Sequence, residues 1–408
     1  MKNIIIGLTG RFGAGCTTAY DLLTTEEKFK GFSLSKYLKI LAINDEKYKK
    51  LNIKKQRTYL QDLGDSLREE HGQNYLAKKV IEEINGSNNQ NTIVVDSFKN
   101  PAEINEFRNE YSNFYLLAID SSTKERWNRT KEYYEEDEEV FKKDDERDKG
   151  TNKFPYKGQQ VDVCMRSSDI LINSDKSFYN HDKTININAV EEYGQKINGY
   201  IKLIKRPGSR GPSLDELYMH QACSNSLRSQ CLKRQVGAII VVDNKIGSFL
   251  IASGTNNVPT GETDCRGQKN CYRDTKKEEM IKKIKYCPNC GNKNSINKNK
   301  KCNKCGEEIY IPKMLDYCKA VHAEEQAILQ AAILGTSVEG TTIYTSTHPC
   351  LLCSKIIINC GIKNVVYFES YPVLESIEML EKCGINRRKF EGVTSRVFNK
   401  VFLEDILN

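Results

Sequence analysis

The chain has 408 residues, of which 38% are hydrophobic and 28% charged, and its formal net charge is +8. This length indicates two or three domains, and no apolar run approaches the roughly 20 residues that cross a bilayer. The mild positive charge is compatible with anionic small molecules or nucleic acid. The N-terminus, MKNIIIGLTG, does not resemble a signal peptide, and several of the fifteen cysteines form C-x-x-C pairs. We therefore expect metal ligation in a reducing cytoplasm rather than disulfides.

The first half of the chain alternates between strand-like and helix-like segments. Continuous apolar runs predict strands buried on both faces, at residues 2–8, 91–96, 113–120 and 170–173. Polar segments such as 56–68 have helical spacing. We therefore expect an α/β domain with a mainly parallel sheet over residues 1–205. The charged stretch 131–150 predicts either a solvated helix or a lid over a nucleotide.

A proline- and glycine-rich stretch, RPGSRGP, makes residues 206–212 the predicted linker. The strand and helix pattern restarts after it, so residues 213–408 form the predicted second domain. A lysine- and asparagine-rich insertion interrupts this domain at about 265–315.

The frame from Gly10 to Thr17 reads G-x-x-x-x-G-C-T and matches a phosphate-binding loop, except that Cys16 replaces the usual lysine. Backbone amides still suit a phosphate, and Thr17 suits magnesium. The predicted nucleotide-binding residues are Gly10, Gly13, Gly15, Cys16, Thr17 and Thr18. We expect binding without efficient phosphoryl transfer, with Arg11 as the candidate replacement cation. A weak kinase or hydrolase and a purely structural loop are the alternatives.

The segments VHAEEQAIL and THPCLLC contain H-x-E followed by P-C-x-x-C, the most specific pattern in the chain. His322, Cys350 and Cys353 supply three zinc ligands, because two cysteines three apart at a helix start face the same way. The fourth tetrahedral position is left for water. Glu324 is the predicted proton carrier between that water and a pyrimidine, as in zinc deaminases. The alternative is a closed structural zinc site.

The insertion contains CPNCGNKNSINKNKKCNKC, two C-x-x-C pairs separated by eleven residues. Four thiolates fill a tetrahedron, so this pattern predicts a structural zinc ribbon, which would supply the folding energy of a segment too polar to build a core. The predicted ribbon ligands are Cys287, Cys290, Cys302 and Cys305. Four other cysteines either bind a further metal or are buried free thiols: Cys231, Cys265, Cys271 and Cys318.

Residues 213–395 resemble the deoxycytidylate deaminases of the cytidine deaminase superfamily, which have a three-layer α/β/α fold. The resemblance rests on the zinc pattern and on the segments CLKRQVGAIIV and SGTNNVPTGETDC. It implies zinc-dependent deamination of dCTP or dCMP. It also implies that Asn256 contacts the sugar hydroxyl, that Arg234 contacts the phosphate and that Ser346 lies near the base.

The first half is similar to P-loop nucleotide kinases, through the loop at 10–18 and the segments SLSKYLK, VVDSFKNPAEI and LAIDSSTKERWNRT. A kinase-like domain fused to a deoxycytidylate deaminase resembles the bacterial antiphage dCTP/dCMP deaminases. That resemblance implies depletion of the deoxycytidine nucleotide pool during infection and regulation through the first domain. A homo-oligomer and a regulatory RNA are the partners that it implies.

Two other classes of function fit parts of the sequence. A nucleic-acid-editing deaminase would need a groove with basic and aromatic residues, and the insertion offers many lysines but few aromatic residues. A non-catalytic, zinc-stabilised scaffold would have no use for Glu324. The sequence leaves open the choice between dCTP and dCMP, and whether the loop with Cys16 retains hydrolysis.

Overall fold

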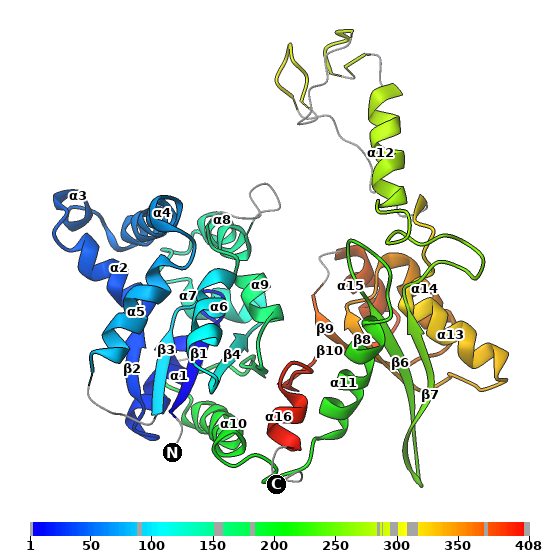
Figure 1. Ribbon diagram of the computed structural model, residues 1–408, viewed down its shortest axis with the longest axis horizontal. Helices are drawn as coiled ribbons and strands as arrows, with labels where there is room; N and C mark the ends of the chain where they lie inside the picture. Colours follow the sequence, from blue (N-terminus) through cyan, green and yellow to red (C-terminus); the bar gives the residue numbers. More distant parts are fainter. Residues whose placement is uncertain are drawn as a thin grey trace. The chain divides into compact units, whose positions relative to one another are not determined.

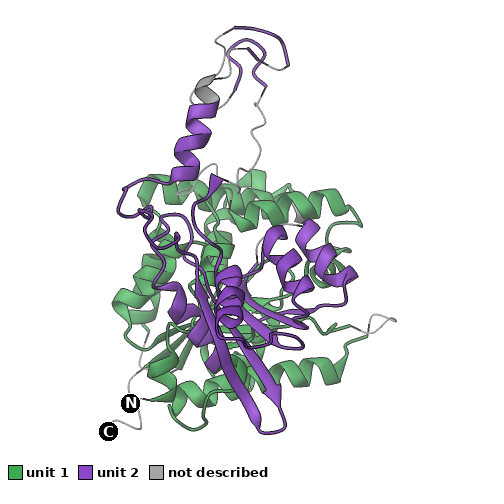
Figure 2. Ribbon diagram, turned by 90° about the vertical axis from the view of Figure 1, so that its right-hand side faces the viewer, with its two compact units in different colours: residues 1–216, 391–408 green, residues 217–390 purple. Residues whose placement is uncertain are grey.

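The computed structural model describes residues 3–87, 92–150, 158–179, 184–283, 286–287, 289–293, 301–307, 317–370 and 374–403. The chain forms two compact units, Met1–Glu216 with Glu391–Asn408, and Leu217–Phe390 (Figure 1). Figure 2 colours the two units separately. Along the described ranges, no helix is both long and apolar enough to cross a membrane.

The first unit is built on a six-stranded sheet in the order β11-β5-β4-β1-β3-β2. Five strands are parallel, and β11 pairs antiparallel with β5 at the edge. The strands are β1 (Ile4–Thr9), β2 (Lys30–Ser33), β3 (Thr92–Asp96), β4 (Phe114–Asp120), β5 (Ile170–Asn173) and β11 (Gly392–Val393). The four predicted strands are confirmed as β1, β3, β4 and β5, and the nearly continuous burial of β1 and β4 agrees with a sheet covered on both faces.

Helices connect these strands. They are α1 (Cys16–Thr25), α2 (Leu34–Ala42), α3 (Glu46–Lys49), α4 (Ile53–His71), α5 (Tyr75–Asn85), α6 (Pro101–Glu110), α7 (Thr123–Thr130), α8 (Glu138–Lys149), α9 (Val161–Arg166), α10 (Ile187–Lys205) and α16 (Phe398–Phe402). The charged stretch at 131–150 contains α8, and this helix is not solvated all round, because Phe141, Asp145 and Asp148 are buried.

The C-terminal segment returns to the first unit, whereas the sequence analysis assigned it to the second domain. The reason is a set of long-range contacts: β11 pairs with β5, and the amide of Thr394 donates to the carbonyl of Asp169 at 2.9 Å. The α16 helix buries Phe398, Val401 and Phe402. The unit boundary lies between Glu216 and Leu217, inside α11 (Leu214–Ser226), a few residues beyond the predicted linker.

The second unit is built on a five-stranded sheet in the order β10-β9-β8-β6-β7. The β6 strand is antiparallel to both β7 and β8, while β8, β9 and β10 are parallel. Besides α11, its elements are β6 (Gly237–Asn244), β7 (Gly247–Thr255), α12 (Tyr272–Lys283), α13 (Ala323–Ile333), β8 (Thr342–Thr347), α14 (Leu351–Asn359), β9 (Asn364–Glu369), α15 (Leu374–Lys382) and β10 (Asn386–Lys389). The α13 helix belongs to the core, where Ala327 and Ala331 pack with Ile240 and Ile343.

Candidate active site

Three side chains from the starts of two helices meet in the second unit. His322 is the N-cap of α13, and Cys350 is the N-cap of α14. The Nδ1 atom of His322 lies 3.2 Å from Sγ of Cys353 and 3.3 Å from Sγ of Cys350. On tetrahedral zinc a nitrogen and a sulfur ligand lie about 3.5 Å apart, only a few tenths of an ångström more than here, so the three residues are close enough together to hold a zinc ion. The structure thus brings together the three predicted ligands.

Hydrogen bonds between α13 and the edge strand β7 fix where the helix starts. The side-chain oxygen of Gln326 accepts from the amide of Thr255 at 2.5 Å, and that of Gln330 accepts from the amide of Ser253 at 2.6 Å. Because β7 is the edge strand of the sheet over the described residues, these glutamines satisfy amides on its open side and hold α13 in one register along β7.

A second set of bonds fixes the turn before α14. The hydroxyl of Ser376 donates to the carbonyl of Pro349 at 2.8 Å, and it lies 2.8 Å from the hydroxyl of Ser354. Pro349 precedes Cys350 and Ser354 is on the helix that follows it, whereas Ser376 comes from α15, and both serines are fully buried. Such outer contacts orient the residues that hold a metal.

Glu324 lies beside the three ligands on the first turn of α13. It is only 5% exposed, and its Oε2 is 3.5 Å from Sγ of Cys353. Burial raises the pKa of Glu324, which suits a group that takes up and releases protons. The pKa of Cys350 is lowered to about 4, first because Cys353 donates a hydrogen bond to it, so this sulfur is a thiolate.

These residues border a cavity of about 240 Å³, lined by His322, Glu324 and Cys350. The cavity is also lined by four cationic side chains, those of Lys233, Arg234, Arg273 and Lys319. Tyr272 and Arg273 come from α12, so the insertion contributes to the cavity wall. This contribution was not predicted from the sequence, since nothing in the spacing of the insertion indicates where α12 lies.

The predicted substrate residues fall in different places. Asn256 lines the cavity, and its side chain bridges the backbone, accepting from the amide of Val236 at 2.7 Å and donating to the carbonyl of Arg234 at 2.9 Å. Arg234 also lines the cavity. Ser346 is not among the lining residues, because its hydroxyl accepts from the amide of Gly237 at 3.1 Å inside the sheet. Its neighbour Thr347 lines the cavity instead.

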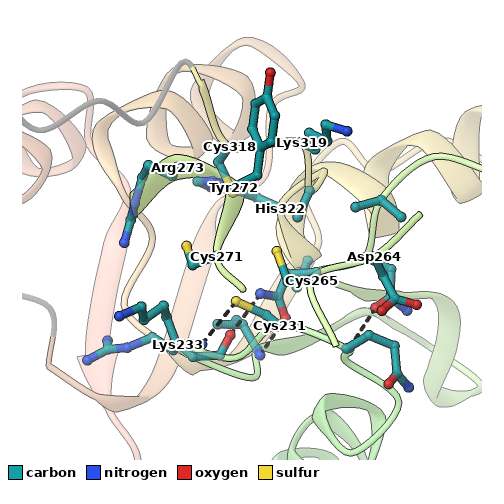
Figure 3. A pocket seen from close by; sticks show the side chains of 18 of the residues that line it. Cys231, Lys233, Asp264, Cys265, Cys271, Tyr272, Arg273, Cys318, Lys319 and His322 are labelled. Carbon is teal, nitrogen blue, oxygen red and sulfur yellow. Dashed lines mark hydrogen bonds between the residues drawn. The ribbon is translucent and has the colours of Figure 1, made fainter. Parts of the chain in front are cut away.

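The four cysteines that the sequence left open all line this cavity: Cys231, Cys265, Cys271 and Cys318 (Figure 3). All four are partly exposed rather than buried. In the described part of the chain, groups of three or more metal-ligating atoms within 4.8 Å form at two places, and neither includes these cysteines. The structure therefore does not bring these four sulfur atoms together into such a group.

The second of those groups consists of the predicted ribbon ligands, Cys287, Cys290, Cys302 and Cys305. The sulfur atoms are 3.9 Å apart for Cys287 and Cys305 and 3.6 Å apart for Cys290 and Cys302, near the value of about 3.8 Å for two thiolates on tetrahedral zinc. Gly291 and Gly306 follow the two pairs with positive φ angles of 67° and 72°. Each donates its amide to the carbonyl of the first cysteine of its pair.

In the first unit, the predicted phosphate loop joins β1 to α1. Gly13 and Gly15 have φ angles of 80° and 107°, which glycine adopts without strain. Burial raises the pKa of Cys16 to about 12, so the thiol that replaces lysine is neutral. Arg11 does not reach into the loop as a free cation, because its guanidinium donates to Asp162 at 2.6–2.9 Å.

The fold and the site define a class, the zinc-binding nucleoside and nucleotide deaminases. Residues 212–369 match the family model described as "Cytidine and deoxycytidylate deaminase zinc-binding region". The chain is 32% identical over 155 residues to the deoxycytidylate deaminase of Enterobacteria phage T4, covering 36% of this chain and 72% of that protein. The chain therefore belongs to the deoxycytidylate deaminase family.

Two further relatives are the deoxycytidylate deaminases of Schizosaccharomyces pombe and Saccharomyces cerevisiae. The first is 29% identical over 244 residues, 58% of this chain, and the second is 33% identical over 180 residues, 44% of this chain. The matched regions span 64% and 45% of the two yeast proteins.

Proposed function

We propose that the chain catalyses the zinc-dependent hydrolytic deamination of deoxycytidine nucleotides, dCMP or dCTP, to the corresponding deoxyuridine nucleotides. One observation carries the proposal: an imidazole and two sulfurs fit a single zinc ion beside a buried carboxyl group that lines a cavity. Membership of the deoxycytidylate deaminase family supports the choice of substrate class.

In this mechanism His322, Cys350 and Cys353 would hold the zinc, which would lower the pKa of water towards roughly 7 and so supply the nucleophile. Glu324 takes the proton from the attacking water and delivers it to the ring nitrogen N3 as the new C4–O bond forms. Glu324 then carries the proton of the new C4 hydroxyl to the exocyclic nitrogen, and the C4–N bond breaks as the C4=O bond forms, so that ammonia leaves.

The cations that line the cavity support a phosphorylated substrate. Arg234, Arg273 and Lys319 line it within one unit, and charge-assisted bonds from such groups favour phosphate oxygens. Asn256 is the proposed contact of the sugar hydroxyl. Ser346 is proposed to lie near the base. Its own hydroxyl accepts a hydrogen bond inside the sheet, so this position depends on the residues next to it in the chain.

Two further zinc-dependent and regulatory features belong to the proposal. The four ribbon cysteines bind a structural zinc, for which their sulfur spacing is the support. The first unit is a P-loop kinase-like domain that senses a nucleotide, with magnesium at Thr17, and its parallel strand order and the glycine loop support this.

A homo-oligomer and a regulatory RNA are proposed from the resemblance to antiphage deaminases. A cytoplasmic location and depletion of the deoxycytidine nucleotide pool in antiphage defence are proposed from the same resemblance.

The test supplies dCMP, dCTP, cytidine nucleotides and a cytosine-containing oligonucleotide to the full chain and measures ammonia and uracil products. We expect conversion of a deoxycytidine nucleotide and a loss of about 10²–10⁴-fold in rate for Glu324→Gln with its zinc retained. Conversion of the oligonucleotide alone would favour an editing enzyme. Absence of any conversion by zinc-loaded protein free of RNA would favour a binding scaffold.

The sensing role has its own test. Deamination is measured with and without added nucleoside triphosphates, in the full chain. A change in the rate or in KM is expected. If no nucleotide at saturating concentration alters the rate, the sensing role of the first unit is contradicted, and the proposed deamination is unaffected.

A further inference from the structure

The phosphate loop of the first unit contacts a carboxylate of the chain itself. Asp148, on α8, is fully buried. Its Oδ2 accepts from the amide of Phe12 in the loop at 3.4 Å and from the guanidinium of Arg57 at 3.0 Å. The ammonium of Lys99 lies 3.7 Å from the same oxygen, and Gln61 donates to the other one at 3.2 Å.

Lys99 stands close to the start of the loop. Its Nζ donates to the carbonyl oxygen of Gly10 at 2.8 Å, although Lys99 itself follows β3, in a different part of the sequence. The lysine that Cys16 replaces would supply a positive charge to phosphates bound at this loop. Lys99 therefore brings a cation to the loop from another element.

A second carboxylate of α8 supports the first. Asp145 accepts from the guanidinium of Arg126 at 2.6 and 3.1 Å, and it lies 3.5 Å from that of Arg11. The guanidinium of Arg57 also stacks on the Phe12 ring, 4.2 Å from its centre. Three cations from other parts of the sequence, Arg57, Lys99 and Arg126, thus reach residues 10–12, and α8 supplies the anions that balance them.

The donors around Asp148 are those that a phosphate oxygen requires: a backbone amide at a glycine-rich loop, a guanidinium and an ammonium. Burial by itself would raise the pKa of Asp148, but Lys99, Arg57 and the Phe12 amide outweigh it and lower the pKa, so the carboxylate is ionised. A buried anion is stable only where such partners surround it. The site is therefore built for one negative charge.

We propose that Asp148 occupies an oxyanion site that otherwise takes a phosphate group of a polyphosphate, and that α8 leaves the loop when such a ligand binds. This deepens the proposed sensing role of the first unit and rests on it. Asp148 and the ligand compete for Lys99, Arg57 and the loop amide, so α8 sets the concentration at which the unit responds.

The experiment measures the binding of inorganic tripolyphosphate to the full chain by calorimetry. Asp148→Asn removes the competing charge and is expected to bind at least tenfold more tightly than the natural chain. The matched control is Glu146→Gln, an exposed side chain of the same helix, which loses the same charge and is expected to bind as the natural chain does. Adding Lys99→Met to Asp148→Asn is expected to reverse the gain.

A second measurement uses the natural chain in case Asp148→Asn does not fold. Amide hydrogen exchange across 138–149 is expected to become faster when tripolyphosphate binds. Binding that leaves this exchange unchanged, or equal affinity for tripolyphosphate in the natural chain, Asp148→Asn and Glu146→Gln, overturns the competition but not the binding of phosphate groups at the loop. If tripolyphosphate binds to none of the proteins, both the competition and the phosphate site are overturned, and tight binding that never alters deamination overturns the sensing role alone.

Discussion

The carbonyl oxygen of Ala323 lies 2.0 Å from the position that a Cβ atom on Gly254 would occupy. The amide nitrogen of Ala327 lies 2.5 Å from the same position. The start of α13 therefore rests directly on the backbone of β7, and only glycine permits this approach. Because His322 and Glu324 are on this helix start, Gly254 sets their distance from the rest of the cavity.

Gly254→Ala is expected to displace α13, destabilise the chain by about 1–3 kcal/mol and lower both zinc content and the rate of deamination. The displaced atoms belong to backbone, which cannot rotate away. Thermal unfolding, metal analysis and rates provide the measurements. Gly199→Ala is the control, since a Cβ there meets nothing within 4 Å. A Gly254→Ala protein with natural zinc content and rate would contradict the argument.

Glu216 ties the returning C-terminal segment to the first unit. Its carboxylate accepts from Arg210 at 2.7 and 2.8 Å and from the amide of Val393 at 3.0 Å. Burial alone would raise the pKa of Glu216, but these bonds outweigh it and lower the pKa below its ordinary value of 4.5. A lowered pKa in the folded state means that the stabilisation is complete above pH 4.5 and is lost as the pH falls further.

Glu216→Gln is therefore expected to destabilise the first unit by about 1–3 kcal/mol at pH 7 and to flatten its loss of stability below pH 4.5. Chemical unfolding at a series of pH values measures both effects. Glu191→Gln, an exposed glutamate of α10, should change neither. The prediction fails if the free energy of unfolding of Glu216→Gln falls with pH below 4.5 as steeply as that of the natural chain.

The ribbon should affect substrate binding, because α12 connects it to Tyr272 and Arg273 in the cavity wall. Cys302→Ser is expected to remove one zinc per chain, to raise KM several-fold and to leave the zinc at His322 in place. Metal analysis and steady-state kinetics make the measurement. Cys383→Ser, at an exposed cysteine, is the control. An unchanged KM after loss of the ribbon zinc would show that the insertion does not hold the wall.

Arg273 should recognise the substrate phosphate. Arg273→Met is expected to raise KM for dCMP about 10–100-fold and to leave deamination of deoxycytidine nearly unchanged, because a charge-assisted bond contributes about 1.5–3 kcal/mol. Lys276→Met removes a cation that pairs with Glu279 along the same helix and should have little effect. If Arg273→Met impaired the deamination of deoxycytidine equally, Arg273 would instead maintain the shape of the cavity.

The sequence by itself determined the elements whose signals are local. Continuous apolar runs gave β1, β3, β4 and β5, because a strand buried on both faces must be apolar at every position. The grouping of Cys350 with Cys353, and of each ribbon pair, follows from spacing, because residues three apart at a turn or helix start face the same way. The short strands β2, β10 and β11 lack such a run and were not predicted.

Only the tertiary structure decided which distant segments meet. It placed α12 in the cavity wall and bonded the hydroxyl of Ser346 to the amide of Gly237. It also returned residues 391–408 to the first unit, and it brought Lys99 and Asp148 to a loop that is more than 80 residues away in the sequence. These contacts depend on pairing between surfaces and on the balance of buried charges. Periodicity and motif spacing describe one segment at a time, so they hold no information about which surfaces come together.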